Sequence, residues 1–97
     1  MKVDWGEAAI RHIGKVRGYL TGQKSLHVDD VIDRIVKRTA LLEDLPYLGA
    51  KVPEYPDHDL RELIEPPFRI LYRVRDDCVD IVAVIHASQK MPRLPRF

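Results

Sequence analysis

The chain has 97 residues, with 16 lysines and arginines, 15 aspartates and glutamates, and a formal net charge of +1. We expect one domain over residues 1–97, because this length leaves no room for a second, regulatory one. The 45% content of hydrophobic residues is ordinary for a globular protein and argues against disorder. The nearly neutral total gives no sign of a strongly basic nucleic-acid-binding protein.

Cys78 is the only cysteine, which excludes an internal disulfide and a cysteine-based zinc site. The N-terminal residues lack the apolar core of a signal peptide. The longest apolar run, Ile81–Ile85, is far shorter than the ~20 residues that span a bilayer. We therefore expect a cytoplasmic protein that does not bind a membrane and needs no cofactor.

The N-terminal half predicts a short strand at residues 2–5 followed by two helices. Apolar residues three or four positions apart mark the first helix, which ends near Gly22: Ala9, Ile13, Val16 and Leu20. The second helix is expected over residues 26–42, with Ser25 as its N-cap. The short connection between them favours an antiparallel helical hairpin.

The C-terminal half changes to the alternation that is typical of strands. Residues 46–58 contain three prolines and predict an irregular loop. Strands are expected at residues 60–64, 68–74 and 79–86, with a tight turn at Asp76 and Asp77.

These elements predict an α+β fold in the order strand, helix, helix, strand, strand, strand. The last three strands form an antiparallel meander in one sheet with the first, and the helical hairpin covers one face. In residues 68–74, the apolar alternate positions should face the helices: Phe68, Ile70, Tyr72 and Val74. Arg69 and Arg73 then point to the uncovered face of the sheet.

The arginines of the sheet are the first candidates for a functional surface. If Arg61, Arg69 and Arg73 share one face, their guanidinium groups could hold a phosphate, and Lys90 and Arg93 would extend this basic set. The alternative is that each arginine pairs with a surface acid, where it contributes little to stability: Asp57, Glu62 or Glu65.

The histidines are weaker candidates. His86 ends the last strand, where it could act as a general acid or base or could simply fix the tail by a hydrogen bond. Asp57, His58 and Asp59 are consecutive and point in different directions, so we expect no metal site. His12 and His27 are isolated and are expected to be surface polar groups.

Taken in order along the chain, several motifs resemble the RelE/ParE superfamily of toxins from bacterial type II toxin–antitoxin systems. They are W-x-x-x-A at residues 5–9, L-x-x-L-P with a following glycine at 42–49, R-E-L at 61–63, F-R-I-L-Y-R-V at 68–74 and I-V-A-V-I-H at 81–86. The resemblance implies a toxin that is neutralised by a cognate antitoxin, whose C-terminal segment wraps the toxin and folds on binding.

The superfamily has two mechanisms. RelE-like toxins cleave mRNA on the ribosome, where a 2′-hydroxyl attacks the adjacent phosphodiester with help from basic and acid–base side chains. ParE-like toxins bind and inhibit DNA gyrase and are not catalysts of this kind. Under the nuclease reading, the resemblance assigns Arg69 to the phosphate and Glu62 and His86 to proton transfer.

The residues favour the ParE-like branch. The lysines that RelE-like nucleases carry on the preceding strand fall near Leu60 and Glu62, and the tail has no tyrosine. We therefore predict a gyrase inhibitor, with an mRNA interferase and a non-toxic antitoxin-binding protein as alternatives. Whether it forms a homodimer or a toxin–antitoxin hetero-oligomer is left open. The residues expected to contact the target or the antitoxin are Arg61, Arg69, Arg73, Lys90, Arg93 and Arg96.

Overall fold

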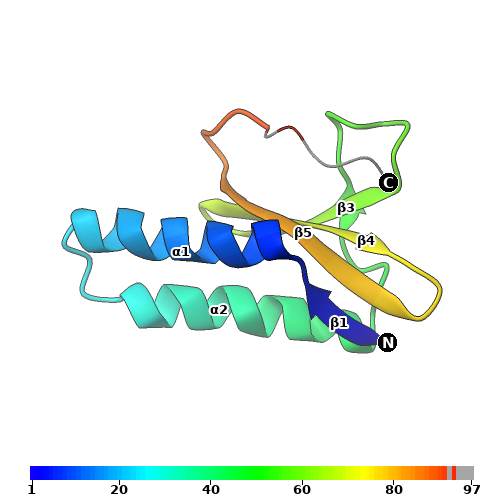
Figure 1. Ribbon diagram of the computed structural model, residues 1–97, viewed down its shortest axis with the longest axis horizontal. Coiled ribbons are helices and arrows are strands. Elements are labelled where there is room, and N and C mark those ends of the chain that lie inside the picture. Colours follow the sequence, from blue (N-terminus) through cyan, green and yellow to red (C-terminus); the bar gives the residue numbers. More distant parts are fainter. Residues whose placement is uncertain (92, 94–97) are drawn as a thin grey trace.

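The computed structural model describes residues 1–91 and 93. An N-terminal strand leads into two antiparallel helices, and four further strands follow (Figure 1). The elements are β1 (Lys2–Trp5), α1 (Glu7–Gly22), α2 (Val28–Ala40), the 3-10 helix η1 (Leu41–Glu43), β2 (Ala50–Lys51), β3 (Leu60–Glu65), β4 (Phe68–Val74) and β5 (Cys78–His86). The predicted α+β class and the order of its main elements are confirmed.

The strands form one sheet in the order β1-β5-β4-β3-β2. The first strand of the chain lies parallel to the last, with Lys2 opposite Cys78 and Trp5 opposite Ile81. All other neighbouring strands are antiparallel. Strand β2, which pairs with β3, was not predicted, because its two residues lie within a loop rich in prolines.

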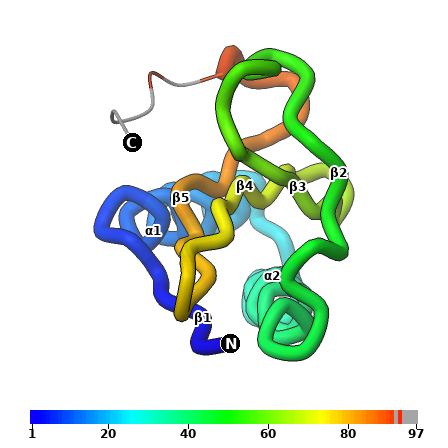
Figure 2. Tube along the Cα trace, turned by 90° about the vertical axis from the view of Figure 1, so that its right-hand side faces the viewer, coloured from blue at the N-terminus to red at the C-terminus, as the bar shows by residue number. Residues whose placement is uncertain are grey.

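The main core lies between the sheet and the helices. Alternate residues of β4 face this core as predicted, and Phe68, Ile70 and Tyr72 are buried there against Ile35 of α2 and Ala9 of α1. Figure 2 shows α2 below the sheet, while the loop before β3 and the segment after β5 arch above it. This side of the sheet is called the helix face below.

The predicted bounds of the second helix were wrong at both ends. Ser25 does not cap it: the Ser25 Oγ accepts a hydrogen bond from the backbone N–H of His27 at 3.2 Å, in a turn that precedes the helix at Val28. At the other end, residues 41–43 tighten into 3-10 geometry, which is frequent in the last turn of a helix. Among residues 1–91 and 93, no helix is both long enough and apolar enough to cross a membrane.

Strand β5 contains a bulge, which determines which of its residues point to each face of the sheet. Leu71 of β4 lies opposite Ala83, but the next residue, Tyr72, lies opposite Ile81, so Val82 is an additional residue. Such a bulge shifts the alternation of the strand. Val79, Ile81 and Val84 therefore contribute to the core beneath the helix face. Ala83 and Ile85 contribute to the other face.

The face opposite the helices is covered, which corrects the prediction of an uncovered face. A second cluster of buried residues lies there, with Tyr55, Val82 and Met91 packed against it: Val52, Leu60, Leu71, Ala83 and Ile85. The loop before β3 and the segment after β5 thus bury a second, smaller core. The cause is that β5 is apolar on both faces and needs burial on both. This side is called the loop face below.

Two glycines inside α1 offer a test of the helix assignment. A β-carbon built on Gly14 or Gly18 would have no atom within 4 Å. Since glycine costs about 0.5–1 kcal/mol relative to alanine inside a helix, Gly14→Ala and Gly18→Ala should each raise the free energy of unfolding by about that amount. Urea denaturation measures this. Gly6→Ala is the control, because its β-carbon would lie 3.2 Å from the Ile81 carbonyl oxygen and should bring no gain.

Candidate functional site

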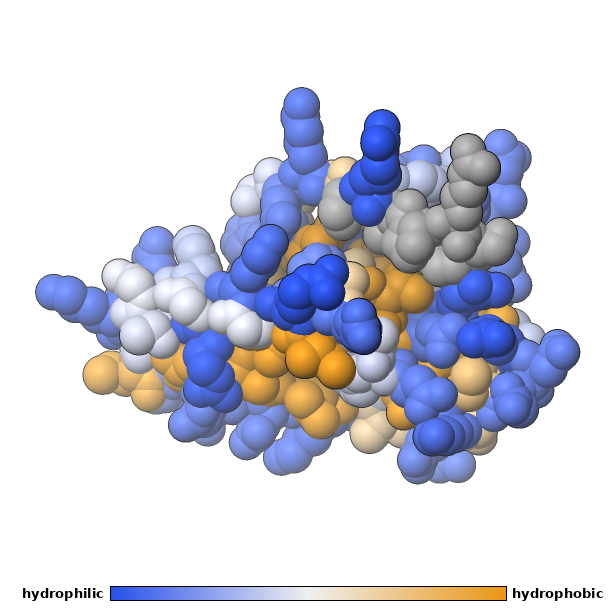
Figure 3. Space-filling model, in the orientation of Figure 1, coloured by the Kyte–Doolittle hydropathy of each residue, from blue (hydrophilic) through white to orange (hydrophobic). Residues whose placement is uncertain are grey.

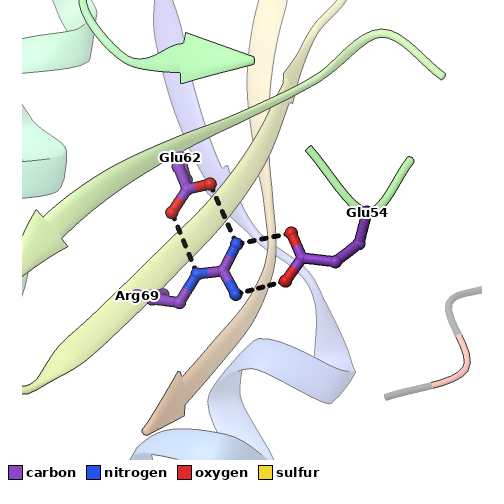
Figure 4. A network of polar contacts seen from close by, with 3 residues as sticks. All are labelled: Glu54, Glu62 and Arg69. Carbon is purple, nitrogen blue, oxygen red and sulfur yellow. Dashed lines mark hydrogen bonds and ion pairs between the residues drawn. The ribbon is translucent and has the colours of Figure 1, made fainter. Parts of the chain in front are cut away.

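Arg69 is the residue that the resemblance assigned to phosphate binding. In the structure its guanidinium group is hydrogen-bonded to two carboxylates (Figure 4). Its Nε and Nη2 donate hydrogen bonds to the two oxygens of Glu62, both at 2.9 Å. Its Nη1 and Nη2 donate to the two oxygens of Glu54, at 2.7 and 2.9 Å. Four of its five N–H groups are therefore used, in two bidentate pairs of the kind that make arginine selective for carboxylates and phosphates.

These three residues come from three segments of the loop face. Arg69 lies on β4, Glu62 on the neighbouring strand β3, and Glu54 in the loop that covers this face. The side chains of Arg69 and Glu62 are only 14% and 10% exposed, whereas that of Glu54 is 42% exposed. We call this group the Arg69 clamp. It joins the covering loop to the sheet and leaves Arg69 unavailable to a phosphate in this structure.

The clamp shifts the pKa values of Glu54 and Arg69. The hydrogen bonds from Arg69 lower the pKa of Glu54 from its ordinary 4.5 to about 2. The hydrogen bonds to Glu54 and Glu62, together with their charge, raise the pKa of Arg69 above its already high ordinary value. Glu54 and Arg69 are thus held in their charged forms at neutral pH.

The Glu54 pKa gives a testable dependence of stability on pH. Because this pKa is lower in the folded protein, the stabilisation is complete above pH 4.5 and is lost as the pH falls toward 2. Glu54→Gln should lower the free energy of unfolding at pH 7 by no more than about 1 kcal/mol, since the carboxylate is largely solvated. The difference between variant and parent should shrink below pH 4.5 in urea titrations. A difference that does not change with pH would contradict the clamp.

Arg61 lies on the opposite side of the sheet, which corrects the prediction of one arginine-lined face. Its Nη1 donates a hydrogen bond to the Gly49 carbonyl oxygen at 2.8 Å, and its guanidinium lies 5.1 Å from the centre of the Tyr47 ring. Its cross-strand neighbour is Tyr72, a residue of the helix-face core. Adjacent positions of a strand point to opposite faces, so Arg61 and Glu62 are separated by the sheet.

The acidic residues that were expected to pair with the sheet arginines do so only in part. Glu62 does pair with Arg69, as the alternative prediction proposed. Glu65 pairs instead with Arg34 and Arg38, which ties β3 to α2. Arg73 is half-buried and continues the alternation of Arg69 along the loop face.

His86 is separated from Glu62 and Arg69. It lies opposite Phe68 at the end of β5, and its ring makes edge contacts with Phe68 and with Tyr19 of α1, at centroid distances of 5.7 and 6.0 Å. Both contacts place it on the helix face, while Glu62 and Arg69 lie on the loop face. The three residues assigned to RNA cleavage are therefore not brought together in the structure.

The basic residues after β5 are the most accessible of the predicted contact set. Lys90 and Arg93 are exposed, and neither forms an ion pair with the residues that the structure describes. Arg96, which was predicted with them, lies outside the described residues.

His12 is the residue whose role the sequence did not reveal. It was expected to be an isolated surface group, but it is half-buried, and its Nδ1 accepts a hydrogen bond from the Val84 backbone N–H at 3.1 Å. This N–H lies on β5 beyond the end of β1, where no strand of the described part of the chain pairs with that edge. His12 also precedes Val16 and Tyr19 by four and seven positions, a spacing that could have placed it on the inner side of α1.

One small group of potential metal ligands is present in the described part of the chain. Single ligand atoms of Asp4, Cys78 and Asp80 lie within 4.8 Å of one another. Asp4 and Asp80 already form ion pairs, with Lys2 and Arg75. Burial and the nearby carboxylates raise the pKa of the Cys78 thiol, which disfavours the thiolate that a metal needs.

A short segment rich in exposed apolar side chains includes Tyr47, the ring that Arg61 contacts. Four large hydrophobic side chains are exposed between the end of α2 and β2: Leu41, Leu45, Tyr47 and Leu48. We call this set the 41–48 patch. Where several exposed apolar side chains gather, they often mark a protein-binding surface.

Two comparisons with known proteins point to the same kind of protein. The family described as "ParE toxin of type II toxin-antitoxin system, parDE" matches residues 3–91. Among solved structures, the chain is similar to one titled "Chromosomal ParDE TA system from P. aeruginosa", with a TM-score of 0.73 and 21% sequence identity over 89% of this chain and 95% of that chain. A search of the curated proteins finds no match.

Proposed function

Because the chain belongs to the ParE toxin family of type II toxin–antitoxin systems, we propose that it inhibits DNA gyrase and is neutralised by a cognate antitoxin. The observation that carries this proposal is the separation of Arg69 and Glu62 from His86 by the sheet. RNA cleavage needs a phosphate-binding cation and proton-transfer groups around one phosphodiester. A gyrase inhibitor needs only a binding surface.

The exposed bases after β5 are our candidates for contact with gyrase. Lys90 and Arg93 lack ion pairs with the described residues, so they can bind an acidic partner without first breaking internal contacts. Arg61 and Arg69 support the fold instead, through Gly49 and through the Arg69 clamp. Of the basic residues predicted to contact the target, we therefore keep those after β5, together with Arg73 on the loop face.

Inhibition of supercoiling by the purified protein tests this proposal. The protein should block supercoiling of relaxed plasmid by gyrase at near-stoichiometric concentration. Lys90→Ala/Arg93→Ala should require about five- to tenfold more protein, because each exposed charge contributes about 1 kcal/mol or less. Lys37→Ala on α2 is the matched control and should inhibit like the parent. Unimpaired supercoiling with excess folded protein would exclude gyrase as the target.

We further propose that the antitoxin covers the 41–48 patch. The support is the exposure of four large hydrophobic side chains in one short segment, which an apolar antitoxin helix or strand would bury: Leu41, Leu45, Tyr47 and Leu48. Expression of the toxin alone should arrest growth, and coexpression with its cognate antitoxin should restore it. Normal growth on expression of the toxin alone would favour the non-toxic alternative.

A further inference from the structure

A groove of about 330 Å³ lies between α1 and the end of β5, on the side of the sheet away from the Arg69 clamp. Its apolar lining comes from Val16 and Tyr19 of α1 and from Phe68 and Val84 of the sheet. Figure 3, which views the molecule from the α1 side, shows hydrophobic atoms between hydrophilic side chains over the middle of this face. The proposed gyrase and antitoxin contacts use none of these residues.

Two histidines, His12 and His86, line this groove. The hydrogen bond to His12 determines which of its ring nitrogens carries the hydrogen. Its Nδ1 accepts from the Val84 backbone N–H and therefore carries no hydrogen. Burial, with added repulsion from Lys15 and Arg11, lowers the pKa of His12, so its ring is neutral at pH 7. The neutral ring has its one hydrogen on Nε2, which has no hydrogen-bond partner among the described residues.

His86 has the same arrangement at the other side of the groove. Its Nδ1 accepts a hydrogen bond from the Ser88 backbone N–H at 3.1 Å and lies 2.7 Å from the Ser88 hydroxyl oxygen. Since a backbone N–H only donates, the His86 Nδ1 carries no hydrogen in this arrangement, and the ring hydrogen is on Nε2. Within the described part of the chain, this second Nε2–H also lacks a partner.

Lys15 and Gln89 add further donors to the groove, beside the Ser88 and Tyr19 hydroxyls, which can donate or accept. Lys15 forms no ion pair with any residue in the described ranges. Gln89 accepts the His86 backbone N–H through its Oε1 at 3.3 Å, which leaves its amide hydrogens free to donate. Among the described residues that line the groove, none is an aspartate or a glutamate.

From this arrangement we propose that the groove binds an oxyanion attached to a small apolar group, with Lys15, Gln89 and the two imidazole Nε2–H groups around the anion. A cation and several N–H donors, with no carboxylate among the described lining residues, are complementary to phosphate or carboxylate oxygens. The apolar walls are complementary to a ring or an aliphatic chain. A phosphomonoester and a carboxylate share this chemistry, and both are outcomes that the test separates.

Titration of the ¹⁵N-labelled full-length protein with phenyl phosphate, benzoate and phenol tests the proposal. Either anion should shift the amide signals of Val84 and Ser88, because these amides donate to the two histidines. Tighter binding of phenyl phosphate assigns the site to phosphomonoesters, and tighter binding of benzoate assigns it to carboxylates. Comparable affinity for both supports the shared chemistry. If neither anion shifts these signals, or if phenol shifts them equally, the proposal is overturned.

Variants separate specific binding from general attraction. Lys15→Gln changes an exposed side chain and should fold normally, and His86→Phe keeps a ring beside Tyr19 and Phe68. Each should weaken binding of the preferred anion by about tenfold or more. Lys37→Gln on α2, away from the groove, should leave the affinity unchanged. Equal weakening by Lys37→Gln would show attraction by net charge and would overturn the site.

Discussion

Replacing Arg69 with methionine should lower the free energy of unfolding by about 2–4 kcal/mol. The methionine keeps apolar volume on β4 but leaves the Glu62 carboxylate, only 10% exposed, without its cation. Removing one partner of a buried ion pair costs far more than replacing both, because the remaining charge loses its compensation. Glu54 can return to water, since its side chain is 42% exposed. Urea denaturation at pH 7 measures the loss.

A double-mutant cycle supplies the control. Arg69→Met/Glu62→Leu removes both buried charges and should be clearly more stable than Arg69→Met alone. At protein concentrations corrected for the folded fraction, Arg69→Met should inhibit gyrase like the parent, because the clamp is structural. A double variant as unstable as the single one would show that desolvation of Glu62 is not the cause.

Replacing Gly49 with alanine should lower the free energy of unfolding by about 2–3 kcal/mol. The new β-carbon would clash with the Glu62 carbonyl oxygen and would lie 2.8 Å from the Tyr72 ring and hydroxyl. Neither neighbour can move easily, because one is sheet backbone and the other is a fully buried tyrosine. The Gly49 N–H also donates to the Tyr72 hydroxyl at 2.8 Å, and this hydrogen bond would be distorted. Thermal and urea denaturation measure the effect.

The background variant Tyr72→Phe distinguishes the two contacts. Alone, it should cost about 1–2 kcal/mol, since the Gly49 N–H loses its buried acceptor. Gly49→Ala in this background should remain strongly destabilising, because the clash with the Glu62 backbone persists. Full rescue by Tyr72→Phe would contradict the backbone clash and leave the hydroxyl contact as the sole cause.

The local pattern of the chain predicted the elements whose neighbours are close in sequence. The spacing of Ala9, Ile13 and Val16 indicated α1, and the alternation of Phe68, Ile70 and Tyr72 indicated β4 and the face that meets the helices. These periodicities arise within one element, so they can be read without knowing the partner. The fold class followed from them.

The features that were missed depend on contacts between distant segments. The bulge at Val82 could not be located because residues 79–86 are apolar on both faces. Glu54 lies 15 residues before Arg69 in an irregular loop, and no periodicity connects the two. The covered loop face follows from the same loop, since Val52 and Tyr55 reach the sheet only after it folds back.

The candidate site also differs from its prediction because it depends on contacts between distant segments. Arg61 and Arg69 are both basic strand residues, yet the register of β3 and β4 places them on opposite faces. His12 acquired its role from the unpaired Val84 N–H, which exists because β1 ends at Trp5. The sequence analysis identified these residues but could not predict which of them would come into contact.

The most direct test of the proposed function compares two reactions of one preparation. Folded toxin is added in parallel to gyrase with relaxed plasmid and to programmed ribosomes with mRNA in the A site. We expect inhibition of supercoiling and intact mRNA, because Arg69 is held by Glu54 and Glu62 and is separated from His86. Codon-positioned mRNA cleavage that is lost in Arg69→Met, with unimpaired supercoiling, would contradict the account.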